Sequence, residues 1–172
     1  MARHDSKIPF AINIFASTLF EVLPNDENLF FSPLVSISAA FGMLYQGVKG
    51  KTADEMRAVF GYNSATLTDD QIHNQWQQMI TSVKQAKKDY IFTIANRVLV
   101  QLQEDFPVLD TFKEGVTSHY NAMVQEVDFV RNAAPVIEEV NEFVKKEPRG
   151  KISQVLKTLD RNTRVVLVNA VS

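Results

Sequence analysis

The sequence contains no cysteine. This absence excludes disulfide bonds, thiolate nucleophiles and cysteine ligands for a metal. It leaves the cellular compartment open, because a chain of 172 residues can bury a core large enough to fold without cross-links.

Long apolar runs and a strong net charge are also absent. No run approaches the roughly 20 apolar residues that cross a bilayer, so nothing predicts a membrane partner. The net charge of -2 gives no reason to expect nucleic acid, whose binding surfaces are strongly basic. The apolar residues between Met1 and Pro24 are interrupted by Asn13, Ser17 and Thr18, which predicts an amphipathic helix and not a signal peptide.

Histidine is scarce, and its three positions suggest no reactive site. His4, His73 and His119 lie far apart and lack the spaced acidic or histidine neighbours of a metal site, so we expect no metal and no cofactor. We interpret them as ordinary surface or helix residues. A Ser-His-Asp triad can be drawn with Ser36, but no nucleophile-elbow pattern supports it, and the sequence predicts a protein that is not an enzyme.

Helical and strand-like patterns alternate along the chain, which predicts an α+β fold. Two capping boxes mark helix starts, at Thr52–Glu55 and at Thr68–Gln71. Apolar periodicity predicts helices over 8–22, from 32 to about 46, from 52 to about 61, from 68 through 83, over 108–119 and over 132–146. Apolar runs predict strands at 29–31, 90–100, 123–129 and 165–171.

The last predicted strand, Val165–Val171, is apolar on both faces. Such a strand belongs in the interior of a sheet, with partners on each side. We therefore interpret residues 1–172 as one part of a single domain, without an internal boundary. The chain is then either a piece of a longer protein or a truncated form.

The stretch from Asn28 to Met56 holds serines among apolar residues. Ser32 and Pro33 predict a helix start, with serine as the N-cap and proline at the first helical position. Small hydroxyls such as that of Ser36 can satisfy buried polar groups and can exchange partners. The alternative is that Ser32 is only a cap and Ser36 only a small packing residue.

Four segments resemble, in the same order, the serpin family of serine protease inhibitors. They are "NLFFSPLVSISAAFGMLYQGVKGKTADEM", "FTIANRVLVQ", "SHYNAMVQEVDF" and "VNEFVKKEPRGKISQVLKTLDRNTRVVLVNAV". The resemblance implies an incomplete serpin-like α+β fold, in which helices pack on part of a large central β-sheet. The C-terminal strands and the reactive loop of the family pattern lie beyond Ser172.

The resemblance implies inhibition of a serine protease by a conformational trap in the complete protein. The protease would be bound through the missing reactive loop, so this chain alone cannot perform the trap. The expected location is extracellular, with the cytoplasm as the alternative. The alternative function is a truncated, non-inhibitory protein that binds or self-associates through the edge of the strand Val165–Val171.

The resemblance also implies a conformational switch, called the shutter, under the main sheet. It assigns Ser32, Pro33, Ser36 and Asn169 to this switch, with the serines hydrogen-bonded to the asparagine. The family usually has S-P-x-S where this chain has Ser32-Pro33-Leu34-Val35-Ser36. One extra residue inside the helix rotates Ser36 by about 100° relative to Ser32, whereas a bulge before the helix moves Ser32 instead. We expect one of the two serines to be displaced.

Lys84, Lys87 and Lys88 share one face of a predicted helix. A solvated helix face is the preferred interpretation. The resemblance adds a heparin-like polysaccharide as the alternative partner of these lysines.

Overall fold

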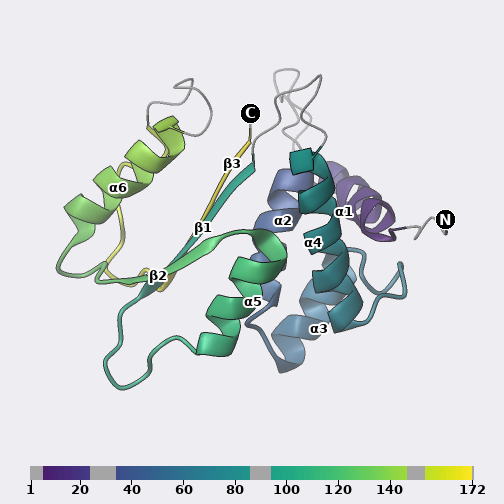
Figure 1. The fold of residues 1–172 in the computed structure, drawn as a ribbon, viewed down its shortest axis with the longest axis horizontal. Helices are drawn as coiled ribbons and strands as arrows, with labels where there is room; N and C mark the ends of the chain where they lie inside the picture. The colour runs from purple at the N-terminus through teal and green to yellow at the C-terminus, as the bar shows by residue number, and fades with distance from the viewer. Residues whose placement is uncertain (1–5, 24–33, 86–93, 147–153, 172) are drawn as a thin grey trace.

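The computed structural model describes residues 6–23, 34–85, 94–146 and 154–171, and these ranges hold six helices and three strands (Figure 1). None of the described helices is long and apolar enough to cross a membrane. In chain order the elements are α1 (Ile8–Val22), α2 (Leu34–Tyr45), α3 (Gly50–Val59), α4 (Asp69–Gln85), β1 (Ile94–Gln101), α5 (Asp110–Tyr120), β2 (Met123–Val127), α6 (Ala133–Lys146) and β3 (Val165–Val171). The strand predicted at 29–31 lies outside the described residues.

The three strands form one mixed sheet in the order β2-β1-β3. β1 is central, parallel to β2 and antiparallel to β3. In the antiparallel pair, Asn96 lies opposite Asn169 and Val100 lies opposite Val165. β1 and β2 are joined through α5, as a parallel pair requires a crossover connection.

Helices cover both faces of the sheet, which gives the protein two cores (Figure 1). Successive strand residues point to opposite faces, so Val98 joins the core under α2 while Leu99 joins the core under α6. The larger core also contains Trp76 of α4 and Tyr120 of α5. The predicted α+β arrangement of helices on a sheet is confirmed.

α6 packs on the sheet with one apolar face. Val136, Val140 and Val144 repeat at a spacing of four and are buried. Arg97 of β1 adds a polar link, because its Nη1 lies 2.7 Å from Oε1 of Glu139 and its guanidinium lies 4.5 Å from the ring centre of Phe143. The predicted amphipathic face of this helix is confirmed.

The helix starts of α1 and α4 agree with the sequence prediction, and those of α3 and α5 differ from it. The capping box of α4 is present, since Gln71 N–H donates to Oγ1 of Thr68 at 3.3 Å and Thr68 N–H donates to Oε1 of Gln71 at 3.0 Å. The box at Thr52 is wrong, because Lys49 is extended and the helix already begins at Gly50, which places Thr52 inside the first turn. α5 begins at Asp110, two residues after the predicted start.

β3 is an outer strand in the part of the chain that the structure describes. Val168 and Ala170 pack toward α6, and Leu167 packs toward the core under α2, so both faces are apolar as predicted. Val165 is 41% exposed. Among the described residues β3 pairs with β1 alone, so the predicted partner on its second edge is not found there.

Gly50 and Gly61 both have positive φ, but only Gly61 is closely packed, so alanine at these two positions distinguishes the cost of backbone strain from the cost of crowding. We expect Gly61→Ala to lower the free energy of unfolding by roughly 2–4 kcal/mol, because φ is +72° and the new Cβ would lie 2.5 Å from the carbonyl oxygen of Ala11. Gly50→Ala is the matched control, with φ +58° and no atom within 4 Å of its Cβ, and costs about 1 kcal/mol. Urea unfolding of both variants measures the difference, and equal losses would contradict the crowding.

Candidate functional site

Two asparagines face each other across β1 and β3. Asn96 and Asn169 are register partners, and Nδ2 of Asn169 donates to Oδ1 of Asn96 at 2.6 Å. Their side chains point to the α2 face, because Val98 and Leu167, two residues away on the same strands, pack into the core on that side. A polar pair, with Asn96 buried and Asn169 half-buried, thereby lies beside apolar side chains on this face of the sheet.

Hydrogen bonds continue from this pair in both directions. Oγ of Ser36, in α2, donates to Oδ1 of Asn169. Nδ2 of Asn96 donates to the backbone carbonyl of Tyr120 at 3.1 Å. We name these four residues, Ser36, Asn169, Asn96 and Tyr120, the amide relay. Each asparagine accepts at its oxygen and donates at its nitrogen, so the bonds share one direction and polarise one another.

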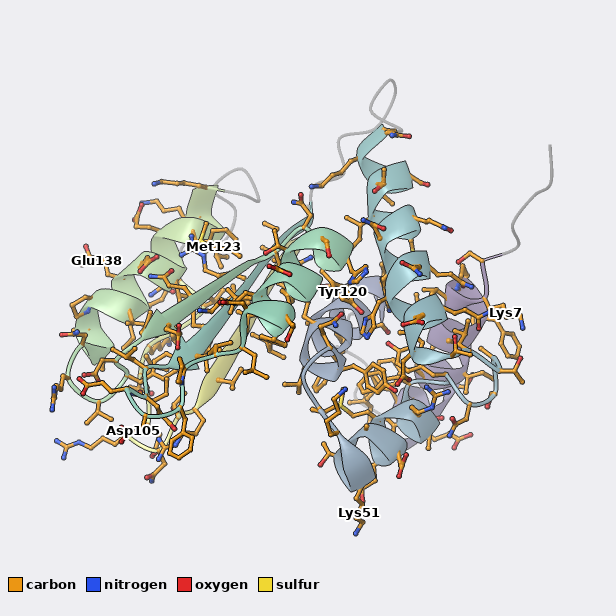
Figure 2. All side chains as sticks on the ribbon, turned by 60° about the horizontal axis from the view of Figure 1, so that its bottom comes forward. Lys7, Lys51, Asp105, Tyr120, Met123 and Glu138 are labelled. Carbon is orange, nitrogen blue, oxygen red and sulfur yellow. The ribbon has the colours of Figure 1, made fainter. Side chains whose placement is uncertain are left out.

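Tyr120 connects the amide relay to α4. It lies where the end of α5 meets the sheet and the helices (Figure 2). Its hydroxyl is 2.7 Å from Nδ1 of His73, and a Cβ at Gly42 would lie 2.8 Å from its ring, so glycine leaves room for the tyrosine. Burial raises the pKa of Tyr120 well above its usual value, which keeps the phenol neutral.

His73 is a helix residue, as one of the two interpretations of the histidines had it, and it is buried in α4 with 8% of its surface exposed. Its ring stacks on that of His119 at a centroid distance of 5.5 Å. Burial, and then the neighbouring His119, lower the pKa of His73 to about 4, so its imidazole is neutral at pH 7. Nδ1 of His119 is buried and has no hydrogen-bond partner among the described residues.

The structure brings together part of the predicted shutter. Ser36 and Asn169 are in contact, so the extra residue before Ser36 does not displace this serine from the asparagine. Ser32 and Pro33 lie outside the described residues. The role of these four residues as a conformational switch stays a prediction.

Sequence reasoning missed Asn96 and Tyr120 of the amide relay and His73, which contacts Tyr120, although the sequence contains a signal for two of these three residues. Asn96 is a polar residue in an apolar strand pattern. His73 shares the buried stripe of α4 with Trp76, three residues later. Tyr120 left none, because a tyrosine at a helix end is unremarkable until its hydroxyl and its carbonyl are both found bonded.

A second polar cluster fixes α3 against the start of α4. Nη1 of Arg57 lies 2.5 Å from Oδ1 of Asp69 and 3.2 Å from the hydroxyl of Tyr45, and that hydroxyl donates to the same carboxylate at 2.7 Å. Arg57 also donates to the carbonyl of Leu67. These contacts are those of a structural ion pair, and no group of three or more histidine, aspartate or glutamate residues in the described ranges could hold a metal ion.

Lys84 lies in the last turn of α4, where a cation complements the helix dipole. Lys87 and Lys88 lie outside the described residues. Polysaccharide binding by the three lysines stays a prediction.

Comparison with known proteins places the chain in a family. The family model described as "Serpin (serine protease inhibitor)" matches residues 8–172. Iripin-1 of Ixodes ricinus is 32% identical over 173 residues, covering 99% of this chain and 43% of Iripin-1. Serpin B9 of Homo sapiens is 37% identical over 166 residues, covering 94% and 42%, and Alpha-1-antiproteinase of Bos taurus is 35% identical over 148 residues, covering 86% and 35%. The chain spans less than half of the length of each of these relatives.

The two asparagines should be energetically coupled. We expect Asn96→Ala and Asn169→Ala each to lower the free energy of unfolding by about 1–3 kcal/mol, because each leaves a buried or half-buried partner unpaired. The double variant should lose less than the sum of the single losses, with a coupling of about 0.5–3 kcal/mol in a urea-unfolding double-mutant cycle.

Asn141 provides the control for this cycle. Its side chain bonds the backbone of Val155 and Leu156, away from the amide relay. The pair Asn141→Ala and Asn169→Ala should therefore be additive within about 0.5 kcal/mol. Additivity of the Asn96 and Asn169 pair would rule out the relay as a coupled unit.

Protonation of His73 should destabilise the protein in acid. Its pKa is about 4 in the folded protein and 6.5 in an ordinary environment, so between these values the unfolded chain binds a proton that the folded chain refuses. The His73 contribution is fully present above pH 6.5 and is lost as the pH falls toward 4, by at most about 1.4 kcal/mol per pH unit. Urea unfolding at several pH values gives the free energy of unfolding as a function of pH. Between pH 4 and 6.5 this free energy should change less steeply with pH in His73→Gln than in the wild type, and an unchanged pH dependence would refute the assignment.

Proposed function

The chain belongs to the serpin family, and from this premise we propose that the longer protein containing it inhibits serine proteases. Residues 1–172 would form the N-terminal part of its single domain. The match over residues 8–172 supports this function, and the free edge of β3 is the structural observation that carries it.

The edge of β3 can receive another strand. β3 pairs with β1 on one side, and its other edge presents backbone donors and acceptors without a strand partner among the described residues. Unpaired edges recruit further strands. In serpins, the cleaved reactive loop inserts into the main sheet as a new strand and releases stored strain. By resemblance, β3 borders the site of this insertion.

The chemical step would occur on the reactive loop of the longer protein. The catalytic serine of the protease attacks the carbonyl carbon of the bait residue, and the peptide bond breaks. An ester then joins protease and loop, while the new amine leaves with a proton. Insertion of the loop beside β3 would drag the enzyme along and distort its active site before water cleaves the ester.

The amide relay would let the sheet open without leaving buried polar groups unpaired. Asn169 belongs to β3, and its partners Ser36 and Asn96 belong to α2 and β1. A shift of β3 must therefore break hydrogen bonds, and small hydroxyl and amide groups can exchange partners where apolar side chains cannot. This supports the proposed switch role of Ser36 and Asn169, while Ser32 and Pro33 join the proposal by resemblance alone.

The same edge supports a second candidate function. If the natural protein has the mass of this chain, 19.4 kDa, the reactive loop is missing and the free edge of Val165–Val171 becomes a self-association surface. Intact mass and light scattering on the natural protein separate the two candidates. An extracellular location, with the cytoplasm as the alternative, stays a prediction.

The inhibitor proposal predicts a covalent complex. Full-length protein incubated with a panel of trypsin-, chymotrypsin- and elastase-like proteases should give a band that survives denaturing electrophoresis and contains both proteins. The same protease with its catalytic serine replaced by alanine is the control and should give none, because no ester can form. Cleavage of the protein by every protease without a stable complex would contradict the proposal.

A further inference from the structure

An apolar cavity of about 500 Å³ lies at one end of the sheet, between α2, α5, β1 and β3. Its volume is within the range of about 300–1,000 Å³ that is usual for small-molecule sites. Most of its wall is aliphatic or aromatic, formed by Leu44, Val48, Val100, Leu109, Phe112 and Val165.

The cavity has a fixed floor and an open mouth. Val100 and Val165 are register partners on β1 and β3, and Leu44 and Phe112 pack against the larger core, so these walls are held by the fold. Leu109, in contrast, is 72% exposed. A ligand can therefore enter from solvent and bury apolar surface against a preformed wall, which is the condition under which such sites bind.

One positive charge borders this apolar wall. Lys49 lines the cavity and forms no ion pair with any described residue. The carboxylate of Glu126 is already engaged, because it accepts from the backbone of Val108 and pairs with Lys113 at 2.9 Å. The charge of Lys49 is thus left for a ligand.

Lys49 borders two hollows, and the charges of the neighbouring residues decide in which of them an anion would bind. The second hollow is polar and is also lined by Asp54, Asp69 and Asp70. Arg57 also lines the hollow but is already paired with Asp69, so Asp54 and Asp70 are left to repel an anion there, whereas Thr111 adds a neutral hydroxyl to the rim of the apolar cavity. An anionic group is therefore favoured on the apolar side.

We propose that this cavity binds a small amphipathic anion, whose apolar chain lies against Leu44, Val100 and Phe112 and whose carboxylate meets Lys49. The site does not need the reactive loop, and Val165 is the one residue of its wall that belongs to β3. It requires only the cavity and the unpaired lysine.

The charge of the ligand is tested with decanoate and decanol, which share an apolar chain. Isothermal titration of the full-length protein should show one site, with decanoate binding about two- to five-fold more tightly than decanol, as for an exposed ion pair. Lys49→Gln should remove this preference. Lys51→Gln is the matched control, because Lys51 is 90% exposed, points away from the protein and pairs with Glu55 at 3.6 Å (Figure 2).

The location is tested by filling the cavity from an exposed position. Thr111→Trp should fold normally by circular dichroism and should weaken both ligands at least tenfold. The proposal is overturned if folded wild-type protein binds neither ligand or prefers decanol. It is equally overturned if Lys49→Gln behaves as Lys51→Gln does, or if Thr111→Trp binds as the wild type does.

Discussion

The hydrogen bond between Asn96 and Asn169 constrains the rest of the structure. The buried amide of Asn96 is costly unless its groups are satisfied, and loss of its partner Asn169 costs about 1–3 kcal/mol. The pair therefore fixes the register of β1 and β3, because a shift of one residue would turn one amide toward α6 and leave the other unpaired. It also requires polar partners from outside the sheet. Ser36 supplies one from α2, and the carbonyl of Tyr120 supplies the other from the end of α5.

This requirement explains how distant helices come to depend on the sheet. Tyr120 offers its carbonyl to β1 and its hydroxyl to His73, so α4 and α5 are positioned by the same residue that satisfies the asparagines. Burial holds both the phenol and the imidazole neutral, so this contact is a hydrogen bond between two neutral groups. The second core, under α6, is held by apolar packing, mainly of valines with Leu99 and Phe129. Its polar network, in which Glu139 accepts from Arg97 and Gln125, is exposed. The two faces of the sheet thus differ in their polar contacts: the α2 face carries the amide relay, and the α6 face carries the ion pair of Arg97 and Glu139.

The accuracy of the sequence predictions follows the range of the interactions involved. α1 and the capping box of α4 were predictable because their determinants lie within a few residues of one another. The valine stripe of α6 was predictable for the same reason. The start of α3 was missed, because Thr52 satisfies a local motif while the path of the chain before it already begins the helix at Gly50. In the site, family resemblance supplied Ser36 and Asn169, but Tyr120 and His73 meet only through tertiary packing across 47 positions, which no local pattern encodes.

β3 takes part in the amide relay, in the proposed strand addition and in the apolar cavity. Its middle carries Asn169 of the amide relay, its outer edge is free in the described part, and its first residue, Val165, lines the apolar cavity. A ligand in the cavity and a strand added at the edge would therefore act on the same element. Coupling between the two would be reciprocal, but it requires that the ligand bind the two positions of β3 with different affinity. Only Val165 of the cavity wall lies on β3, whereas Leu44 and Phe112 lie on helices. Such coupling can pass through Val165 itself or through its pairing with Val100. It can also pass through α2, which carries both Leu44 and the Ser36 that bonds Asn169.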